Sequence, residues 1–522
     1  MHEKLWTAFS IAVLLCLPAC RTADRPASGG SPTESGVGVR VLWAADHARR
    51  FANDAYGQDL RHMGVIVWYP SSPDPARPIG PTTAGGILAM LEDAAPEQAR
   101  DFAVQARLYT LASIRTYAID PAVGAAARAA TRPEHELLAS VGRAVAGARP
   151  APGRHPVVVY HPGLGGNPLE NTALCESLAA RGHVVITSTF LHQEVWQDRF
   201  FCGQTDTSLG DVAFLLNEVA AQIPFADTGR VALIGHSFGA QVALIAACQP
   251  GNTIDAVVAL DTTIDYKSVE QIESPLYRAT SWNRVLQTVT SGAQNCRAGV
   301  LNVSGIMPDG STPDYAIVRR LIDSRIRLAT VGYDMDHESY LSQPRLALTL
   351  LGGPADEAGA IRNERDRRTY DALVGLVADF LDQELRGAPP TAAHPNADLA
   401  VTTRGPVHRP DAAEALAIYE REGPDAIKHL FRTLQAISPR ATFSTNRILD
   451  ELDARGAHAE AIDLIGFLLS FDSNATNWRL ERLLGDAYMA SGDTGRARTH
   501  YRRALAQCDD ADAARQIRQL LD

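Results

Sequence analysis

The sequence predicts an α/β fold with a mostly parallel sheet, followed by a smaller all-helical domain. Two observations support this prediction. From residue 155 onward, short apolar runs such as VVVY, VVIT and VALI alternate with stretches of helix-forming residues. The runs are continuously apolar, which is typical of strands that are buried on both faces of a parallel sheet. After residue 410 such runs stop, and pairs of helical segments follow.

The expected elements follow in chain order. Residues 39–70 contain two β-rich runs around a polar loop, and residues 85–147 change to helix formers, which predicts a helical insertion. Strand-like runs then alternate with helices up to about residue 385. The next segment is rich in proline and lacks periodicity, which is typical of a linker. The predicted boundaries are 39–387 for the α/β domain, 388–410 for the linker and 411–522 for the helical domain.

Composition excludes one class of partner. The chain has 522 residues, of which 46% are hydrophobic, and a formal net charge of −11. A protein that neutralises phosphates needs clustered Lys and Arg, and no such cluster appears, so we expect no nucleic-acid partner. CxxC and HExxH patterns do not occur in the sequence, so we predict no metal site and no cofactor.

The first twenty residues resemble a bacterial lipoprotein signal. One lysine precedes an apolar run from Leu5 to Leu17, and Pro18-Ala19-Cys20 closes it. The resemblance implies a signal peptide over residues 1–20, lipid attachment at Cys20 and a membrane partner, with an ordinary secretory signal as the alternative. Residues 21–38 are rich in Ser, Gly, Pro and Thr, which predicts a flexible tether. The expected location is extracytoplasmic, either lipid-anchored or secreted.

The five cysteines beyond residue 20 leave their pairing open. Their odd number implies at least one free thiol outside the cytoplasm. Bridges between Cys175 and Cys202 and between Cys248 and Cys296 are alternatives to buried free cysteines. The fifth cysteine is Cys508.

The C-terminal helices resemble tetratricopeptide repeats. Small and large residues recur at the spacing of that repeat in the last helix pair: Leu484, Gly485, Tyr488, Ala497, Tyr501 and Ala504. The resemblance covers residues 411–522 and implies a protein partner. The alternative is a generic helical bundle.

A sharp strand-to-helix turn presents a candidate nucleophile. Gly235-His236-Ser237-Phe238-Gly239 fits the pattern G-x-S-x-G, and it stands between an apolar run and a helix-forming stretch. Side chains at the two outer positions would clash with neighbouring elements, so both positions need glycine. The turn would hold Ser237 clear of the sheet at a helix N-terminus.

An activated serine also needs oxyanion donors. The first should be the backbone N–H of Phe238, directly after the nucleophile. The second should come from an earlier strand-end loop, and residues 160–166 (YHPGLGG) follow an apolar run. Its candidate donor is Leu164 N–H. We expect His161 to support this loop and His192 to line the pocket.

The general base should be a histidine at the end of the last strand of the domain. His337, in LATVGYDMDHESYL, has that position. Its alternative role is a surface group or part of a metal cluster, because Asp334, Asp336 and Glu338 lie nearby. His236 lies on the wrong side of the turn to act as the base.

These motifs resemble the platelet-activating-factor acetylhydrolase family (isoform II-like), within the α/β-hydrolase superfamily. The match lies in GHSFG, in VVALD and in GLG preceded by His161-Pro162, where Pro162 is an extra residue relative to the family. The resemblance covers residues 39–385. It implies calcium-independent hydrolysis of esters, including short or oxidised acyl groups on phospholipids. Dienelactone hydrolases share the scaffold but use cysteine, whereas this chain has Ser237.

Two aspartates compete for the role of the acid. In most α/β hydrolases the acid follows the strand after next from the elbow, which nominates Asp309, whereas the acetylhydrolase family nominates Asp261. Strand-end geometry favours Asp261, because it follows Leu260 directly, while Asp309 lies in a Gly-, Ser- and Pro-rich loop. Asp265 and Asp336 are lesser candidates.

Together the residues predict a serine carboxylic-ester hydrolase. Ser237 would attack the carbonyl of a small-molecule or lipid ester, His337 would transfer protons and Asp261 would orient His337. One alternative is a peptidase or polyesterase of the same fold. Another is an inactive hydrolase domain fused to a protein-binding repeat scaffold.

Overall fold

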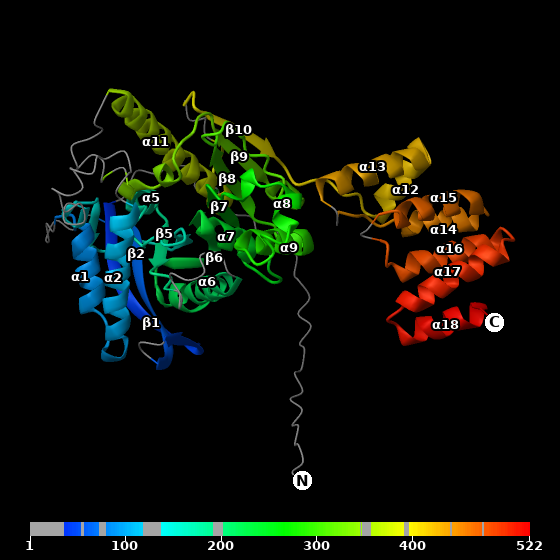
Figure 1. The fold of residues 1–522 in the computed structure, drawn as a ribbon, viewed down its shortest axis with the longest axis horizontal. Helices are drawn as coiled ribbons and strands as arrows, with labels where there is room; N and C mark the ends of the chain where they lie inside the picture. Colours follow the sequence, from blue (N-terminus) through cyan, green and yellow to red (C-terminus); the bar gives the residue numbers. More distant parts are fainter. Residues whose placement is uncertain are drawn as a thin grey trace, which may run out of the picture. The chain divides into compact units, whose positions relative to one another are not determined.

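The computed structural model describes most of the chain after residue 35 (Figure 1). The predicted signal segment with Cys20, most of the predicted tether, and His192 lie outside the described residues. The described ranges are 36–53, 57–72, 80–117, 137–191, 202–344, 346, 357–390, 396–438, 441–471 and 474–521.

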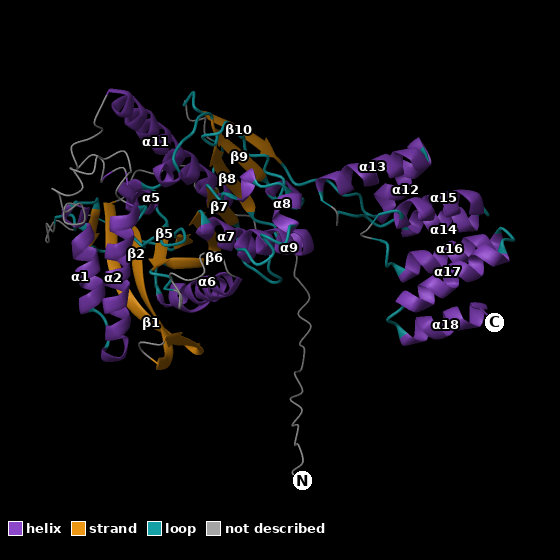
Figure 2. Cartoon of the chain, in the orientation of Figure 1, coloured by secondary structure: helices purple, strands orange, loops and turns teal. Residues whose placement is uncertain are grey.

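The centre of the fold is a sheet that has ten strands in the described part of the chain (Figure 2). The strand order is β10-β9-β8-β7-β6-β4-β5-β2-β1-β3. Six consecutive strands of this order, from β9 to β5, pair in parallel, whereas β2 pairs antiparallel with both β1 and β5. The predicted mostly parallel sheet is confirmed. The strands are β1 (Gly36–Asn53), β2 (Gly57–Ser71), β3 (Ala144–Ala146), β4 (His155–His161), β5 (Val184–Ser188), β6 (Ala226–His236), β7 (Ala256–Leu260), β8 (Gly299–Gly305), β9 (Ile326–Val331) and β10 (Leu399–Arg404).

Helices cover both faces of the sheet, and β4 shows why its strands are continuously apolar. Val157 and Val159 pack in one core with α6, α7 and α9, whereas Val158 and Tyr160 pack in a second core with α1, α5 and α11. Because successive side chains of a strand point to opposite faces, both sets must be apolar. The helices are α1 (Ala84–Asp93), α2 (Arg100–Tyr117), α5 (Thr172–Ala180), α6 (Cys202–Phe214), α7 (Phe238–Ala247), α8 (Val269–Glu273), α9 (Ser281–Gly292) and α11 (Glu357–Arg386).

The predicted bounds of the tether, the helical insertion and the linker were wrong. Part of each segment forms a β-strand, because it pairs with a neighbouring strand near an edge of the sheet. β1 begins at Gly36, inside the predicted tether, and β3 lies at the end of the predicted helical insertion, where it pairs in parallel with β1. β10 lies inside the predicted linker and pairs antiparallel with β9. Its sequence LAVTTR carries three adjacent β-branched residues, so a neighbouring strand suffices to extend it despite the surrounding prolines.

The C-terminal region is all-helical. At Gly485 of α16 a Cβ atom would lie 2.5 Å from Tyr501 Cε1 of α17, so this helix contact needs glycine. In the described part of the chain, the helices are all too short or too polar to cross a membrane. The similarity to tetratricopeptide repeats stays a prediction. The helices are α12 (Ala412–Glu422), α13 (Pro424–Ile437), α14 (Asn446–Ala454), α15 (His458–Leu469), α16 (Trp478–Ala490), α17 (Thr494–Gln507) and α18 (Ala511–Leu521).

A buried ion pair ties the first two strands to α6. Both carboxylate oxygens of Asp211 accept hydrogen bonds from the Arg61 guanidinium, and Arg49 Nη1 lies 2.9 Å from Asp211 Oδ1. The Asp211 side chain is fully buried and that of Arg61 is 4% exposed. Because a buried charge is costly without its counter-charge, the integrity of this part of the fold depends on Asp211.

Replacing Asp211 with asparagine should therefore lower the free energy of unfolding by about 3–5 kcal/mol, because Arg61 stays buried while its counter-charge is lost. Urea denaturation measures the change. The matched control is Asp227→Asn, which breaks a partly exposed ion pair with Arg230 and should cost under about 1 kcal/mol. An equal loss of unfolding free energy in the two variants would contradict the conclusion that the buried ion pair of Asp211 and Arg61 stabilises this part of the fold.

Candidate active site

Ser237 sits at a strained turn between β6 and α7. Its φ is 51° and its ψ is −113°, a positive-φ conformation that residues other than glycine rarely adopt. The strain is held by neighbouring backbone, because Ser237 N–H donates to Leu260 O at 2.8 Å. The turn leaves the Ser237 side chain partly exposed at the N-terminus of α7.

The two glycines of the motif are required by close backbone contacts. At Gly235 a Cβ atom would lie 2.1 Å from the carbonyl carbon of Gly239, and at Gly239 it would lie 2.2 Å from His161 O. These distances are far below van der Waals contact. Glycine at the first position lets α7 turn back over β6, and glycine at the second lets α7 approach the end of β4.

His337 is held by Asp261 across the end of the sheet. His337 Nδ1 lies 2.5 Å from Asp261 Oδ2, and Asp261 directly follows β7 with a φ of 45°. Asp261 N–H donates to Val303 O at 2.8 Å, which anchors it to β8. The Tyr266 hydroxyl lies 3.1 Å from the other carboxylate oxygen of Asp261. Asp261 is therefore fixed on both sides.

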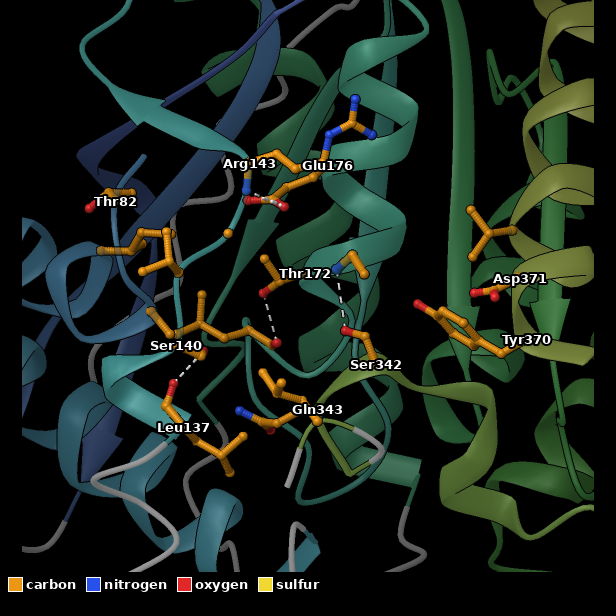
Figure 3. A pocket seen from close by; sticks show the side chains of 18 residues that line it. Thr82, Leu137, Ser140, Arg143, Thr172, Glu176, Ser342, Gln343, Tyr370 and Asp371 are labelled. Atoms are coloured by element: carbon orange, nitrogen blue, oxygen red, sulfur yellow. Dashed lines mark hydrogen bonds between the residues drawn. The ribbon is translucent and has the colours of Figure 1, made fainter. Parts of the chain in front are cut away.

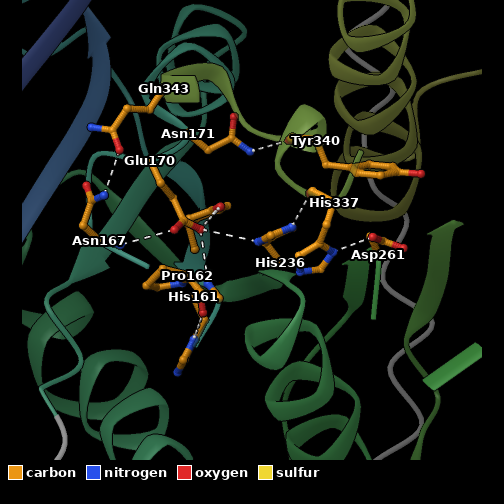
Figure 4. A network of polar contacts seen from close by, with 12 residues as sticks. His161, Pro162, Asn167, Glu170, Asn171, His236, Asp261, His337, Tyr340 and Gln343 are labelled. Carbon is orange, nitrogen blue, oxygen red and sulfur yellow. Dashed lines mark hydrogen bonds and ion pairs between the residues drawn. The ribbon is translucent and has the colours of Figure 1, made fainter. Parts of the chain in front are cut away.

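His337 also meets the serine turn. The ring centroids of His236 and His337 are 4.5 Å apart, and His236 Nε2 lies 3.0 Å from the His337 carbonyl oxygen. Since His236 is the chain neighbour of Ser237, this contact brings the turn and the His337–Asp261 pair together in one site (Figure 4).

The pKa of His337 should be measurably raised. Burial lowers it, but the hydrogen bond and the charge of Asp261, together with the charges of Glu338 and Glu170, raise the pKa above its ordinary value of 6.5. The free imidazole, which can accept a proton, then predominates only at pH values above that raised pKa. We expect NMR titration to show this shift, and Asp261→Asn to move the pKa downward. An unchanged pKa in that variant would show that the contact does not form in solution.

Asp309 and Asp336, the other candidates for the acid of the triad, bind partners other than His337. Asp309 is exposed and accepts a hydrogen bond from Ser311 N–H at 2.9 Å. Asp336 is also exposed and lies 3.3 Å from Arg362 Nη2. Each therefore has a local surface partner.

Asp265 is buried beside Asp261 but turns toward β8. It accepts hydrogen bonds from Asn302 Nδ2 at 2.6 Å and Ser304 Oγ at 2.7 Å. Burial raises its pKa to about 6. These contacts assign Asp265 to the support of the strand ends.

The glycine loop, defined as residues 163–170, lies against the serine turn. A Cβ atom built on Gly163 would lie 3.4 Å from Ser237 Cβ and 3.0 Å from His236 Nδ1. The loop is tightened by a hydrogen bond from Gly166 N–H to Gly163 O at 3.0 Å. Leu164 packs partly buried against the core on the α7 face of the sheet, and Phe238 begins α7. Phe238 thus follows Ser237 directly, and Leu164 follows Gly163, the loop residue that lies against Ser237.

His161 is buried at the start of this region. Its Nδ1 lies 2.8 Å from Pro162 O, and its ring centroid is 4.0 Å from that of Phe190. Burial lowers its pKa to about 4, so the ring is neutral at pH 7. The structure places His161 beside the glycine loop.

Sequence reasoning missed the buried polar network around the site. Glu170 and Asn167 lie within the glycine loop (Figure 4). Tyr266 lies within hydrogen-bond distance of Asp261. None of the three belongs to a recognisable motif. The available signal was weak: an acidic residue seven positions after Gly163, just before a helix that is otherwise rich in apolar residues.

A separate cavity of about 500 Å³ opens between the insertion, α5 and α11 (Figure 3). Neither Ser237 nor His337 lines it. Its wall includes Glu176, whose carboxylate accepts hydrogen bonds from Arg143 N–H at 2.9 Å and Ala144 N–H at 3.1 Å. Glu176 therefore anchors the β3 edge of the sheet.

Within the described residues, His, Cys, Asp and Glu side chains form no group of three or more that could hold a metal ion. Cys175, Cys248, Cys296 and Cys508 are free thiols. The side chain of Cys202 lies outside the described residues.

Comparison with protein families supports the fold. Residues 143–281 match the dienelactone hydrolase family, a range that includes the glycine loop, Ser237 and Asp261 but ends before His337. A ferulic acid esterase from Streptomyces cinnamoneus is similar in structure, with 20% identity and a TM-score of 0.45 over 72% of this chain and 98% of that chain. An acylaminoacyl peptidase from Pyrococcus horikoshii has 14% identity and a TM-score of 0.32 over 47% of this chain and 40% of that chain. No curated protein matches. The chain thus has an α/β-hydrolase-like fold, and its residues 143–281 are similar to the dienelactone hydrolase family.

Proposed function

We propose that the chain is a serine carboxylic-ester hydrolase with the triad Ser237, His337 and Asp261. The proposal rests on two features that lie in the same site. Ser237 has the strained φ of 51° at the strand-to-helix turn, and the neighbouring His337 is held by Asp261 at 2.5 Å. Similarity of residues 143–281 to a hydrolase family supports the same class of chemistry.

In the proposed reaction, Ser237 Oγ attacks the ester carbonyl carbon while His337 takes the hydroxyl proton. His337 then gives that proton to the leaving alkoxide, so an alcohol departs and an acyl-serine remains. Water, deprotonated by His337, attacks the acyl-serine; the second tetrahedral intermediate then releases the carboxylic acid as His337 returns the proton to Ser237 Oγ. Asp261 keeps the His337 ring oriented and stabilises its charged form. The N–H groups of Leu164 and Phe238 donate to the oxyanion of each tetrahedral intermediate.

The proposed substrates are esters of short or oxidised acyl groups, including those on phospholipids, as the acetylhydrolase resemblance implies. Under this proposal a lipid on Cys20 would hold the enzyme beside bilayer substrates, and the C-terminal helices would dock a protein partner. The alternatives remain a peptidase or polyesterase, and an inactive hydrolase domain on a repeat scaffold.

A fluorophosphonate probe tests the proposal, because it reacts with a serine only when a base activates it. We expect covalent labelling at Ser237, located by peptide mass spectrometry, and hydrolysis of soluble esters that declines as the acyl chain lengthens. Labelling with peptide cleavage but no ester hydrolysis would favour the peptidase. A folded protein without labelling would be an inactive scaffold and would overturn the proposal.

A further inference from the structure

A buried carboxyl group lies behind the candidate catalytic histidine. Glu170 and His236 are each 3% exposed, and His236 Nδ1 lies 3.9 Å from Glu170 Oε1. Figure 4 shows the Glu170 carboxyl group between Asn167 of the glycine loop and His236, with His337 on the far side of His236. Neither residue has a chemical step in the proposed mechanism.

Glu170 holds the glycine loop by backbone contacts. Its Oε1 accepts hydrogen bonds from the Tyr160 hydroxyl at 2.7 Å and from Gly163 N–H at 3.2 Å, and its Oε2 accepts from Asn167 N–H at 3.2 Å. The fit is close, because a Cβ atom on Gly166 would lie 2.1 Å from Oε2. Gly163 and Asn167 stand on either side of Leu164, so the carboxyl group determines where that amide lies.

His236 holds the segment that carries the base. The His337 carbonyl oxygen can only accept, so His236 Nε2, 3.0 Å away, must donate. Burial and the nearby charge of His337 lower the pKa of His236 well below 6.5, which leaves the ring neutral with an unprotonated Nδ1 on the Glu170 side. Burial raises the pKa of Glu170 to about 7. The two side chains thus lie in contact in a buried row from the glycine loop to His337, with 3.9 Å and no hydrogen bond between His236 Nδ1 and Glu170 Oε1.

We propose that Glu170 is a positioning residue which, through His236, fixes the glycine loop relative to His337. The inference rests on the proposed function, because a fixed distance between oxyanion donors and base matters only if both act on one substrate. Oxyanion hydrogen bonds are used mainly in the transition state, so loosening the loop lowers kcat more than it weakens substrate binding.

Glu170→Gln tests the proposal because its amide NH2 cannot accept from Asn167 N–H. We expect kcat toward a short soluble ester to fall by about ten- to a hundredfold, the scale of a small misplacement of catalytic groups, with KM changed by less than about threefold. The matched control is Glu176→Gln, the same change at another buried carboxyl group that accepts hydrogen bonds from two backbone N–H groups. It should lower the melting temperature while leaving kcat near that of the wild type.

A second pair of variants tests the link through His236. His236→Gln keeps an N–H donor near the position of Nε2, and His236→Leu removes it. We expect the glutamine variant to retain several-fold more kcat than the leucine variant at equal melting temperature. A kcat for Glu170→Gln within about threefold of the wild type, or a kcat loss equal to that of Glu176→Gln, overturns this inference alone. A wild type that neither labels nor hydrolyses esters overturns the proposed function and this inference with it.

Discussion

Replacing Ser237 with alanine should lower kcat for ester hydrolysis by about a thousandfold or more, because the attacking oxygen is lost. A small residual rate should persist, since the proposed oxyanion donors, the Leu164 and Phe238 amides, would still act on the substrate. Burst and steady-state kinetics with a chromogenic short-chain ester measure the change. Fluorophosphonate labelling should be lost in the same variant.

The Ser237→Ala variant should fold normally. Alanine bears the same Cβ as serine, so the strained φ of 51° costs the folded state about as much in both proteins. A melting temperature close to that of the wild type serves as the control. Near-normal turnover by the folded variant would sink the proposed mechanism.

Asp261→Asn should lower kcat by up to about ten-thousandfold. An asparagine cannot stabilise the imidazolium, and it can hold the ring in the tautomer that presents the wrong nitrogen to Ser237. Asparagine tolerates the φ of 45° found at this position nearly as well as aspartate does. Steady-state kinetics over pH 5–9, about the range in which a histidine titrates, measure the effect.

The control for this prediction is Asp309→Asn, the same change at the rival acid. Asp309 is exposed and bonds to Ser311, so the variant should keep kcat within about threefold of the wild type. If Asp309→Asn caused the large loss and Asp261→Asn the small one, the acid would be Asp309. That result would also weaken the resemblance to the acetylhydrolase family.

Local patterns predicted the sheet well and its edges poorly. The continuous apolar runs of β4 and β5 are dictated by burial on two faces, and that requirement is visible in the sequence alone. β3 and β10 are short edge strands among prolines, glycines or helix formers. These strands form because they pair with a neighbouring strand, so no pattern within their own sequence predicts them.

The candidate site divides in the same way. Ser237 could be predicted, because the strained turn requires one glycine on each side of it, and both glycines are visible in the sequence. Asp261 could be nominated as a strand-end residue, but its contact with His337 could not be derived. Glu170 was missed altogether, since its partners Tyr160 and Gly163 are recognisable only once the loop has folded around it.

By itself, the sequence determined the mostly parallel sheet, the helical C-terminal region and the turn that carries Ser237. Each depends on periodicity or on backbone sterics within a short segment, which neighbouring residues decide. Only the tertiary structure decided which aspartate meets His337 and which carboxyl group supports the glycine loop. Asp261 and His337 are 76 positions apart, and they meet because β7, β8 and β9 lie side by side in the sheet. Strand order results from packing across the whole domain, so no local segment encodes it.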